Sequence, residues 1–163
     1  MSRDFINIMK IKQLQKGFTL IEVLVVIGII AVLAGIVLVA VNPARQFKLA
    51  RDSQRTSNIT AILSAIGQNI SEHKGQFVCN GGPMNFPPAT TTIRHDSSGT
   101  GVHIAACLVP NYISSLPFDP SSSTASYSSV EEYNTEYGIF EDGSGRITVT
   151  AQGELQPVIS VTR

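Results

Sequence analysis

A single acidic residue in a long apolar segment is the side chain whose chemistry most needs an explanation. Residues 18–41 carry no charged side chain except Glu22. A helix of that length rises about 36 Å, enough to cross the hydrocarbon core of a membrane. An unpaired carboxylate in lipid costs on the order of 2.5–3.5 kcal/mol. Because the segment holds no Lys, Arg or His, Glu22 must obtain its counter-charge from elsewhere.

Cleavage of the chain between Gly17 and Phe18 would supply that charge. The cut would create a positive α-amino group on Phe18, which helical spacing places one turn from Glu22 on the same face. The amino group could neutralise Glu22 of its own chain or of a neighbouring copy. The predicted chemistry is therefore proteolytic processing of this chain.

The residues around this bond resemble the prepilin peptidase site of type IV pilins and type II secretion pseudopilins. They read Lys-Gly-Phe-Thr-Leu-Ile-Glu-Val over residues 16–23. The resemblance implies cytoplasmic cleavage after Gly17 by a prepilin peptidase, N-methylation of Phe18, and a role for Glu22 in aligning each subunit with its neighbour. An ordinary signal anchor that happens to contain a glutamate is the alternative.

The only two cysteines, Cys79 and Cys107, are expected to form one disulfide in an exported domain. Two free thiols are the alternative. A thiol redox pair requires closer spacing, such as C-x-x-C, and a zinc site requires more ligands.

No catalytic constellation is visible, and we expect a protein that is not an enzyme. The three histidines lack metal-ligand spacing, and the serines lie in low-complexity loops. Lys+Arg and Asp+Glu both total 12, so net charge does not favour a nucleic-acid partner. Residues 116–120 resemble a motif of pseudopilins, in which a nearby loop of the major members binds calcium. Only Asp119 fits that ligand set, so we expect no cofactor and keep Asp119 as a weak calcium candidate.

Four regions are expected to position these residues. They are a leader at 1–17, a transmembrane and assembly helix at 18–41, a head-packing helix at 42–75, and a globular head at 76–163. Four basic residues flank the apolar segment on each side, so charge counting leaves the orientation undecided. The peptidase-like site places the N-terminus in the cytoplasm.

Asn42-Pro43 follows the apolar segment, where the chain either kinks or begins a second helix. Further along, a stripe of Ile59, Ile62, Ile66 and Ile70 has helical spacing and should pack on the head. A basic ridge precedes the stripe, and we expect it either to be solvated or to contact acidic groups. The ridge comprises Arg45, Lys48, Arg51 and Arg55.

The head is expected to begin irregularly and to end in a small antiparallel sheet. Residues 101–110 could form a short helix or a strand. Strands at 137–141 and 146–151 flank the turn signal Asp-Gly-Ser-Gly, and a third follows at 157–161. The predicted fold is α+β, a pilin fold in which a long N-terminal helix packs on about three strands.

These observations predict a structural subunit of a type IV pilus-like filament, with a type II secretion pseudopilin as the alternative. A membrane-anchored binding module that does not polymerise is the alternative from another class. The expected partners are copies of the chain itself, prepilin peptidase, an inner-membrane assembly platform with its ATPase, and membrane lipid. The resemblance implies a single-pass bacterial inner-membrane protein that becomes a cell-surface or periplasmic filament.

Overall fold

The computed structural model describes residues 17–95 and 99–163. The predictions for the leader therefore lie outside the described residues, except at Gly17. The chain divides into two units between Asn42 and Pro43, and each is described by itself.

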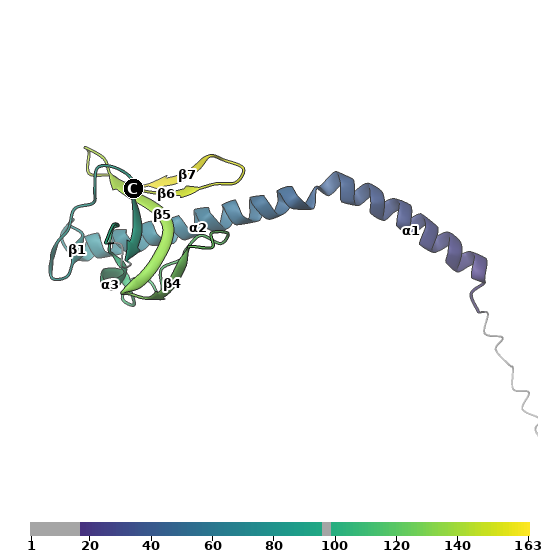
Figure 1. The fold of residues 1–163 in the computed structure, drawn as a ribbon, viewed down its shortest axis with the longest axis horizontal. Helices are drawn as coiled ribbons and strands as arrows, with labels where there is room; N and C mark the ends of the chain where they lie inside the picture. The colour runs from purple at the N-terminus through teal and green to yellow at the C-terminus, as the bar shows by residue number, and fades with distance from the viewer. Residues whose placement is uncertain (1–16, 96–98) are drawn as a thin grey trace, which may run out of the picture. The chain divides into compact units, whose positions relative to one another are not determined.

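The first unit contains helix α1, Leu20–Val41 (Figure 1). Thr19 precedes it in an extended conformation (φ −80°, ψ 151°), and the helix ends at Asn42 in the left-handed region (φ 44°). No residue of α1 is buried. The helix is long and apolar enough to cross a membrane, and within the described chain nothing covers its apolar surface.

The second unit begins with helix α2, Pro43–Glu72. Proline is well tolerated at the first helical position because the amide hydrogen that it lacks has no partner there. Asn42-Pro43 therefore begins a second helix, one of the two alternatives that the sequence left open. The helix ends before Lys74 and Gly75, which both have positive φ, and the Gly75 N–H donates to the Ile70 carbonyl at 2.9 Å.

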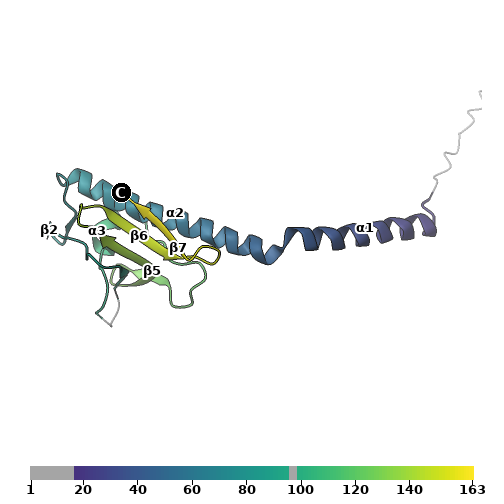
Figure 2. The same ribbon diagram turned by 90° about the horizontal axis from the view of Figure 1, so that it is seen from above.

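The predicted isoleucine stripe of α2 is confirmed as the centre of the head's core. Ile59, Ile62 and Ile66 have no exposed surface, and α2 packs on strands β6 and β7. In both ribbon views these strands lie along one side of the helix (Figures 1 and 2).

The predicted C-terminal strands are present and form consecutive antiparallel neighbours. They are β5 (Glu132–Glu141), β6 (Ile147–Gln152) and β7 (Val158–Thr162). Ile139, Val149 and Val161 face one another across the three strands. This row lies on the face turned towards the core, as the alternation of apolar and polar residues predicts.

The sheet is larger than expected, because two polar strands extend it. Strand β3 (Thr91–His95) pairs with β5, and β4 (Ser126–Ser129) also pairs with β5. Each has little apolar content: only Ile93 of β3 is buried, and Tyr127 of β4 is half-buried. Strand patterning could not identify them, since pairing with β5 rather than an apolar stripe holds them in the sheet.

A short hairpin and a short helix lie at the end of α2. The hairpin comprises β1 (Val78–Cys79) and β2 (Gly82–Pro83), and the helix is α3 (Ala105–Leu108). Cys79 and Cys107 form a disulfide between β1 and α3, as the sequence predicts. Residues 101–110 thus contain a helix rather than a strand.

Candidate processing and assembly site

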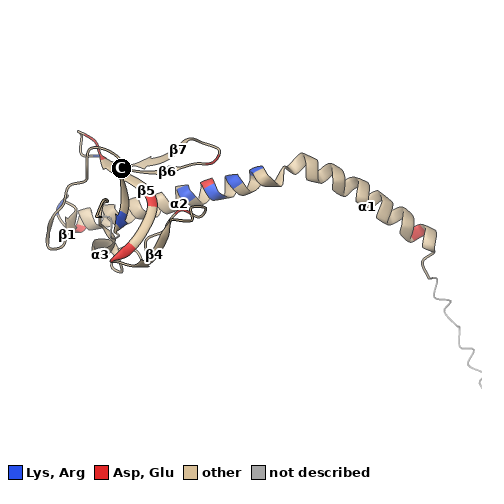
Figure 3. Cartoon of the chain, viewed as in Figure 1, with Lys and Arg blue, Asp and Glu red and all other residues tan. Residues whose placement is uncertain are grey.

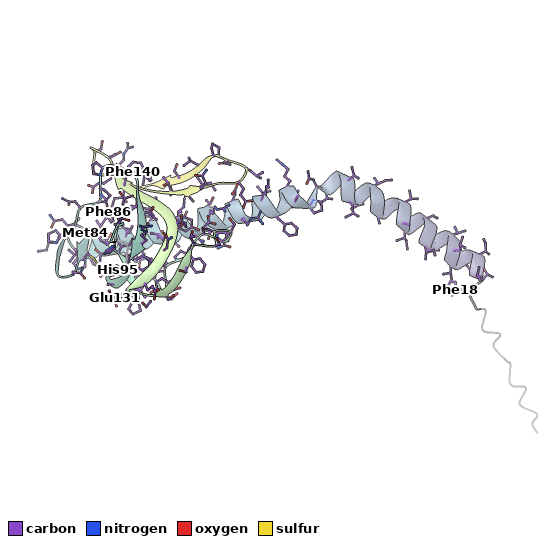
Figure 4. The ribbon with its side chains drawn as sticks, in the orientation of Figure 1. Phe18, Met84, Phe86, His95, Glu131 and Phe140 are labelled. Atoms are coloured by element: carbon purple, nitrogen blue, oxygen red, sulfur yellow. A yellow bond between two sulfur atoms is a disulfide. The ribbon has the colours of Figure 1, made fainter. Side chains whose placement is uncertain are left out.

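The predicted cleavage bond lies in an exposed, non-helical segment ahead of α1. Phe18 has 84% of its surface exposed (Figure 4). The sequence placed Phe18 on the same helical face as Glu22, but in the uncut chain the helix begins at Leu20. Phe18 and Gly17 therefore precede the first helical turn, where a peptidase can bind the backbone without unwinding a helix.

Glu22 takes part in a capping box that sequence reasoning missed. Its amide N–H donates to the Thr19 hydroxyl at 3.2 Å, and its carboxylate accepts from the Thr19 N–H at 3.4 Å. The signal was present in the sequence as Thr-x-x-Glu ahead of an apolar run. The negative carboxylate also lies at the positive end of the helix dipole. In the uncut chain, the Glu22 carboxylate is thus stabilised by local backbone groups.

Gly17 is not required by the packing of this chain. A Cβ atom added there meets no atom within 4 Å, and its φ lies outside the left-handed region. If glycine is needed at this position, the need arises from an external partner.

Replacing Gly17 with valine should therefore leave the chain folded but slow its cleavage. A misfit of this size in a substrate site lowers turnover by about tenfold or more. Quantitative immunoblotting of uncut and cut forms over time measures the effect. Gly28→Ala is the matched control, because Gly28 is equally open but lies far from the bond. Equal cleavage of Gly17→Val and wild type would contradict the prediction.

A second cluster of charged groups is centred on Arg55 of α2, whose side chain is only 3% exposed. Its Nε and Nη2 donate to the two carboxylate oxygens of Asp119 at 2.7 and 3.1 Å. Its Nη1 donates to Asp52 at 2.8 Å and to Glu154 at 3.2 Å, and Nη2 also donates to Ser121 at 2.5 Å. One guanidinium group thus joins α2, the loop after Leu116, and the β6–β7 turn.

The β6–β7 turn is held to α2 by backbone and side-chain contacts. Asp52 accepts from the N–H groups of Glu154 and Leu155, both at 2.9 Å. Arg51 forms a bidentate pair with Glu154, at 2.5 and 2.6 Å. Hydrogen bonds from backbone N–H groups to a carboxylate, and bidentate Arg–carboxylate pairs, are among the stronger hydrogen bonds in proteins.

The basic ridge predicted on α2 is therefore not uniformly solvated. Arg51 and Arg55 pair with acidic groups of the head. The alternative of contact with acidic groups is correct for these two, and the acids belong to the same chain. Basic residues gather on the first half of α2 (Figure 3).

Both carboxylate oxygens of Asp119 accept hydrogen bonds from Arg55. Its Oδ1 also accepts from the Ser121 and Ser122 amides, at 2.8 and 3.1 Å. A calcium role for Asp119 stays an untested prediction, and binding would require the ion to displace Arg55.

The carboxylates of this cluster have shifted pKa values. Burial acts to raise the pKa of Asp52 and of Asp119, but hydrogen bonds from backbone N–H groups and from Arg55 outweigh it and lower both. The hydrogen bond from Arg51 lowers the pKa of Glu154 to about 2. Hydrogen bonding to Asp119 raises the pKa of Arg55.

Acid should therefore destabilise the head over a defined pH range. Because these pKa values are lower in the folded state than in the unfolded chain, the cluster stabilises the head above the ordinary value of 4.5 for Glu154. The contribution is lost as pH falls from about 5 towards 2. Circular dichroism of the full chain in detergent, as thermal midpoint against pH, measures this. Glu154→Gln should flatten the decline, and an equally steep decline in that variant would argue against the cluster.

A ring contact joins two histidines of the head. His95 and His103 stack with ring centroids 4.0 Å apart, a contact that the sequence did not suggest, and His95 Nδ1 lies 3.5 Å from Glu131 (Figure 4). In this arrangement the ring faces, rather than the ring nitrogens, are turned towards each other. In the described parts of the chain, no group of three His, Cys, Asp or Glu residues is placed to bind a metal.

Comparison with known proteins identifies the N-terminal segment. Residues 12–38 match the model of the prokaryotic N-terminal methylation motif. The chain is 38% identical over 78 residues to prepilin peptidase-dependent protein D of Escherichia coli (strain K12), which covers 48% of this chain and 52% of that protein. The chain thus spans about half the length of this relative. No solved structure matches the chain. These matches confirm the recognition of a prepilin-type N-terminus: the chain carries the prokaryotic N-terminal methylation motif.

Proposed function

We propose that this chain is a structural subunit of a type IV pilus-like filament. It is cut after Gly17 by a prepilin peptidase, N-methylated on Phe18, and polymerised through α1. The observation that carries the proposal is the helix itself. Its 22 residues are all exposed, its only charged residue is Glu22, and it begins inside the matched motif.

The apolar surface of α1 must be shielded from water, and two different partners shield it before and after assembly. Before assembly the cover is lipid, with the helix anchored in the inner membrane and the N-terminus in the cytoplasm. In the filament it is the α1 helices of other copies. Gly28 and Gly35 have no atom within 4 Å of an added Cβ, so a neighbouring helix can approach closely there.

Transfer from lipid to filament is not driven by the hydrophobic effect alone, because lipid chains are as apolar as a helix core. The proposal therefore includes an inner-membrane assembly platform and its ATPase as partners. The assembled filament lies at the cell surface or in the periplasm.

A type II secretion pseudopilin is the second candidate. It is favoured by residues 116–120, which resemble a pseudopilin motif and whose Asp119 is bound to α2 through Arg55. The site of the filament separates the two: a pilus extends from the cell surface, whereas a pseudopilus remains in the periplasm. A membrane-anchored binding module that never polymerises is the alternative from another class.

N-terminal mass analysis of the mature protein tests the proposal. We expect a chain that begins at Phe18 and carries one additional methyl group on its amino nitrogen. A functional protein that retains residues 1–17 would overturn the proposal, since Glu22 would then lack the counter-charge on which assembly depends. An uncut chain from a strain without the peptidase provides the matched reference.

A further inference from the structure

The four cations on the first half of α2 fall into two pairs with different surroundings. Arg51 and Arg55 are engaged by acidic groups of the head. Arg45 and Lys48 lie in the segment 43–50, in which every residue is exposed. We call residues 43–50 the first-turns segment. The head does not cover this segment, although it belongs to the same helix.

The first-turns segment combines positive charge with exposed apolar side chains. No Asp or Glu lies between Glu22 and Asp52. Asp52, one turn after Lys48, is bound by Arg55 and by the amides of Glu154 and Leu155. Phe47 is 65% exposed and Leu49 is 47% exposed. At helical spacing Arg45 and Lys48 share one face, and Phe47 and Leu49 flank Lys48 on either side. Basic residues beside an aromatic and an aliphatic side chain are typical of segments at a membrane interface.

The segment is close to the end of α1 in any arrangement of the two units. The two links from Val41 to Pro43 span at most about 7 Å. From Pro43 to Lys48 the helix rises about 7.5 Å. The Cα atom of Lys48 therefore lies within roughly 15 Å of that of Val41. The polar layer of a bilayer adds about 5–8 Å beyond the hydrocarbon core on each side, so a lysine side chain can reach it.

We propose that the first-turns segment docks on the anionic phospholipid surface at the outer face of the membrane that α1 crosses. Arg45 and Lys48 contact lipid phosphates, and Phe47 inserts at the boundary with the acyl chains. Charge complementarity and continuity with the apolar helix select this partner. The inference rests on the proposed function only in requiring that α1 spans a membrane.

The chain contains no tryptophan, so a single Phe47→Trp substitution gives a unique fluorescent reporter. The full chain is reconstituted in vesicles of phosphatidylcholine with or without phosphatidylglycerol, and quenching by brominated lipid is measured. We expect quenching to increase about twofold with 30% anionic lipid, because each basic residue gains attraction near an anionic surface. The Arg45→Gln/Lys48→Gln pair added to the reporter should abolish this increase, and high salt should reduce it.

Gln68→Trp is the matched control, because Gln68 is exposed on the same helix and lies about 30 Å along it from Lys48. Its quenching should not depend on anionic lipid. Equal quenching of the Phe47→Trp reporter in both vesicles, or an increase that survives the Gln pair, would overturn the proposal. Quenching that changes with the protein-to-lipid ratio and not with the fraction of anionic lipid would also overturn the proposal. In that case a second copy of the chain would cover the segment. Flotation with the vesicles separately tests whether α1 inserts, and its failure would count against the proposed function instead.

Discussion

Replacing Glu22 with glutamine is expected to abolish filament assembly and leave cleavage after Gly17 intact. The charge of Glu22 is the only one in α1, and the proposed filament pairs it with the new amino group of Phe18. An amino group left without its counter-charge in an apolar helix core costs on the order of 2.5–3.5 kcal/mol per subunit. We expect at least a tenfold loss of filaments, measured by shearing and immunoblotting, with normal amounts of cut protein.

The capping box makes this test specific for charge. Glutamine retains the hydrogen bond to the Thr19 N–H, because either residue serves at this position, whereas Glu22→Ala loses both the bond and the charge. Thr19→Val retains the charge but loses the hydroxyl that accepts from the Glu22 N–H, at about 1 kcal/mol of helix stability. We expect Glu22→Gln and Glu22→Ala to fail equally and Thr19→Val to assemble. Normal assembly of Glu22→Gln would show that Glu22 acts as a cap.

Removing the guanidinium group at Arg55 is expected to destabilise the head more than any other single change in the charged cluster. Arg55→Ala leaves the carboxylates of Asp52 and Asp119 buried without their cation. Breaking a buried ion pair from one side costs about 4 kcal/mol. Urea unfolding of the full chain in detergent, followed by circular dichroism, measures the loss.

Two comparison variants identify the cause of that loss. Arg51 also pairs with Glu154, but the Arg51 side chain is 36% exposed. Arg51→Ala should therefore lower the free energy of unfolding much less than Arg55→Ala. Arg55→Met/Asp119→Leu removes the main pair together and should recover part of the stability. If the double variant were as unstable as Arg55→Ala, lost packing rather than the stranded charge would be the cause.

Much of the candidate processing and assembly site could be predicted from the sequence, because it is formed by residues close together in the chain. The motif at residues 16–23 and the apolar helix were predicted from residue types alone. The capping box also follows from local sequence, as Thr-x-x-Glu ahead of an apolar run, although the charge of Glu22 alone does not predict it. Only the start of the helix required the structure, which places Phe18 outside α1 in the uncut chain.

The head was partly predictable for the same reason. The isoleucine stripe and the three C-terminal strands repeat at the periods of a helix and of strands, so the sequence shows which face each buries. Strands β3 and β4 lack that repeat. They exist because β5 offers backbone partners to segments that are distant in sequence.

The sequence by itself determined an apolar helix with one acid, a processing motif ahead of it, and a helix that packs on a hairpin sheet. These depend on neighbouring residues and short periods. Only the tertiary structure decided which basic residues of α2 form ion pairs with acidic residues of the head. Arg45, Lys48, Arg51 and Arg55 are alike in sequence, but folding brings Asp119 and Glu154 to the last two from 64 and 103 residues away. Such long-range pairing leaves no local pattern, since it depends on where the chain returns to the helix.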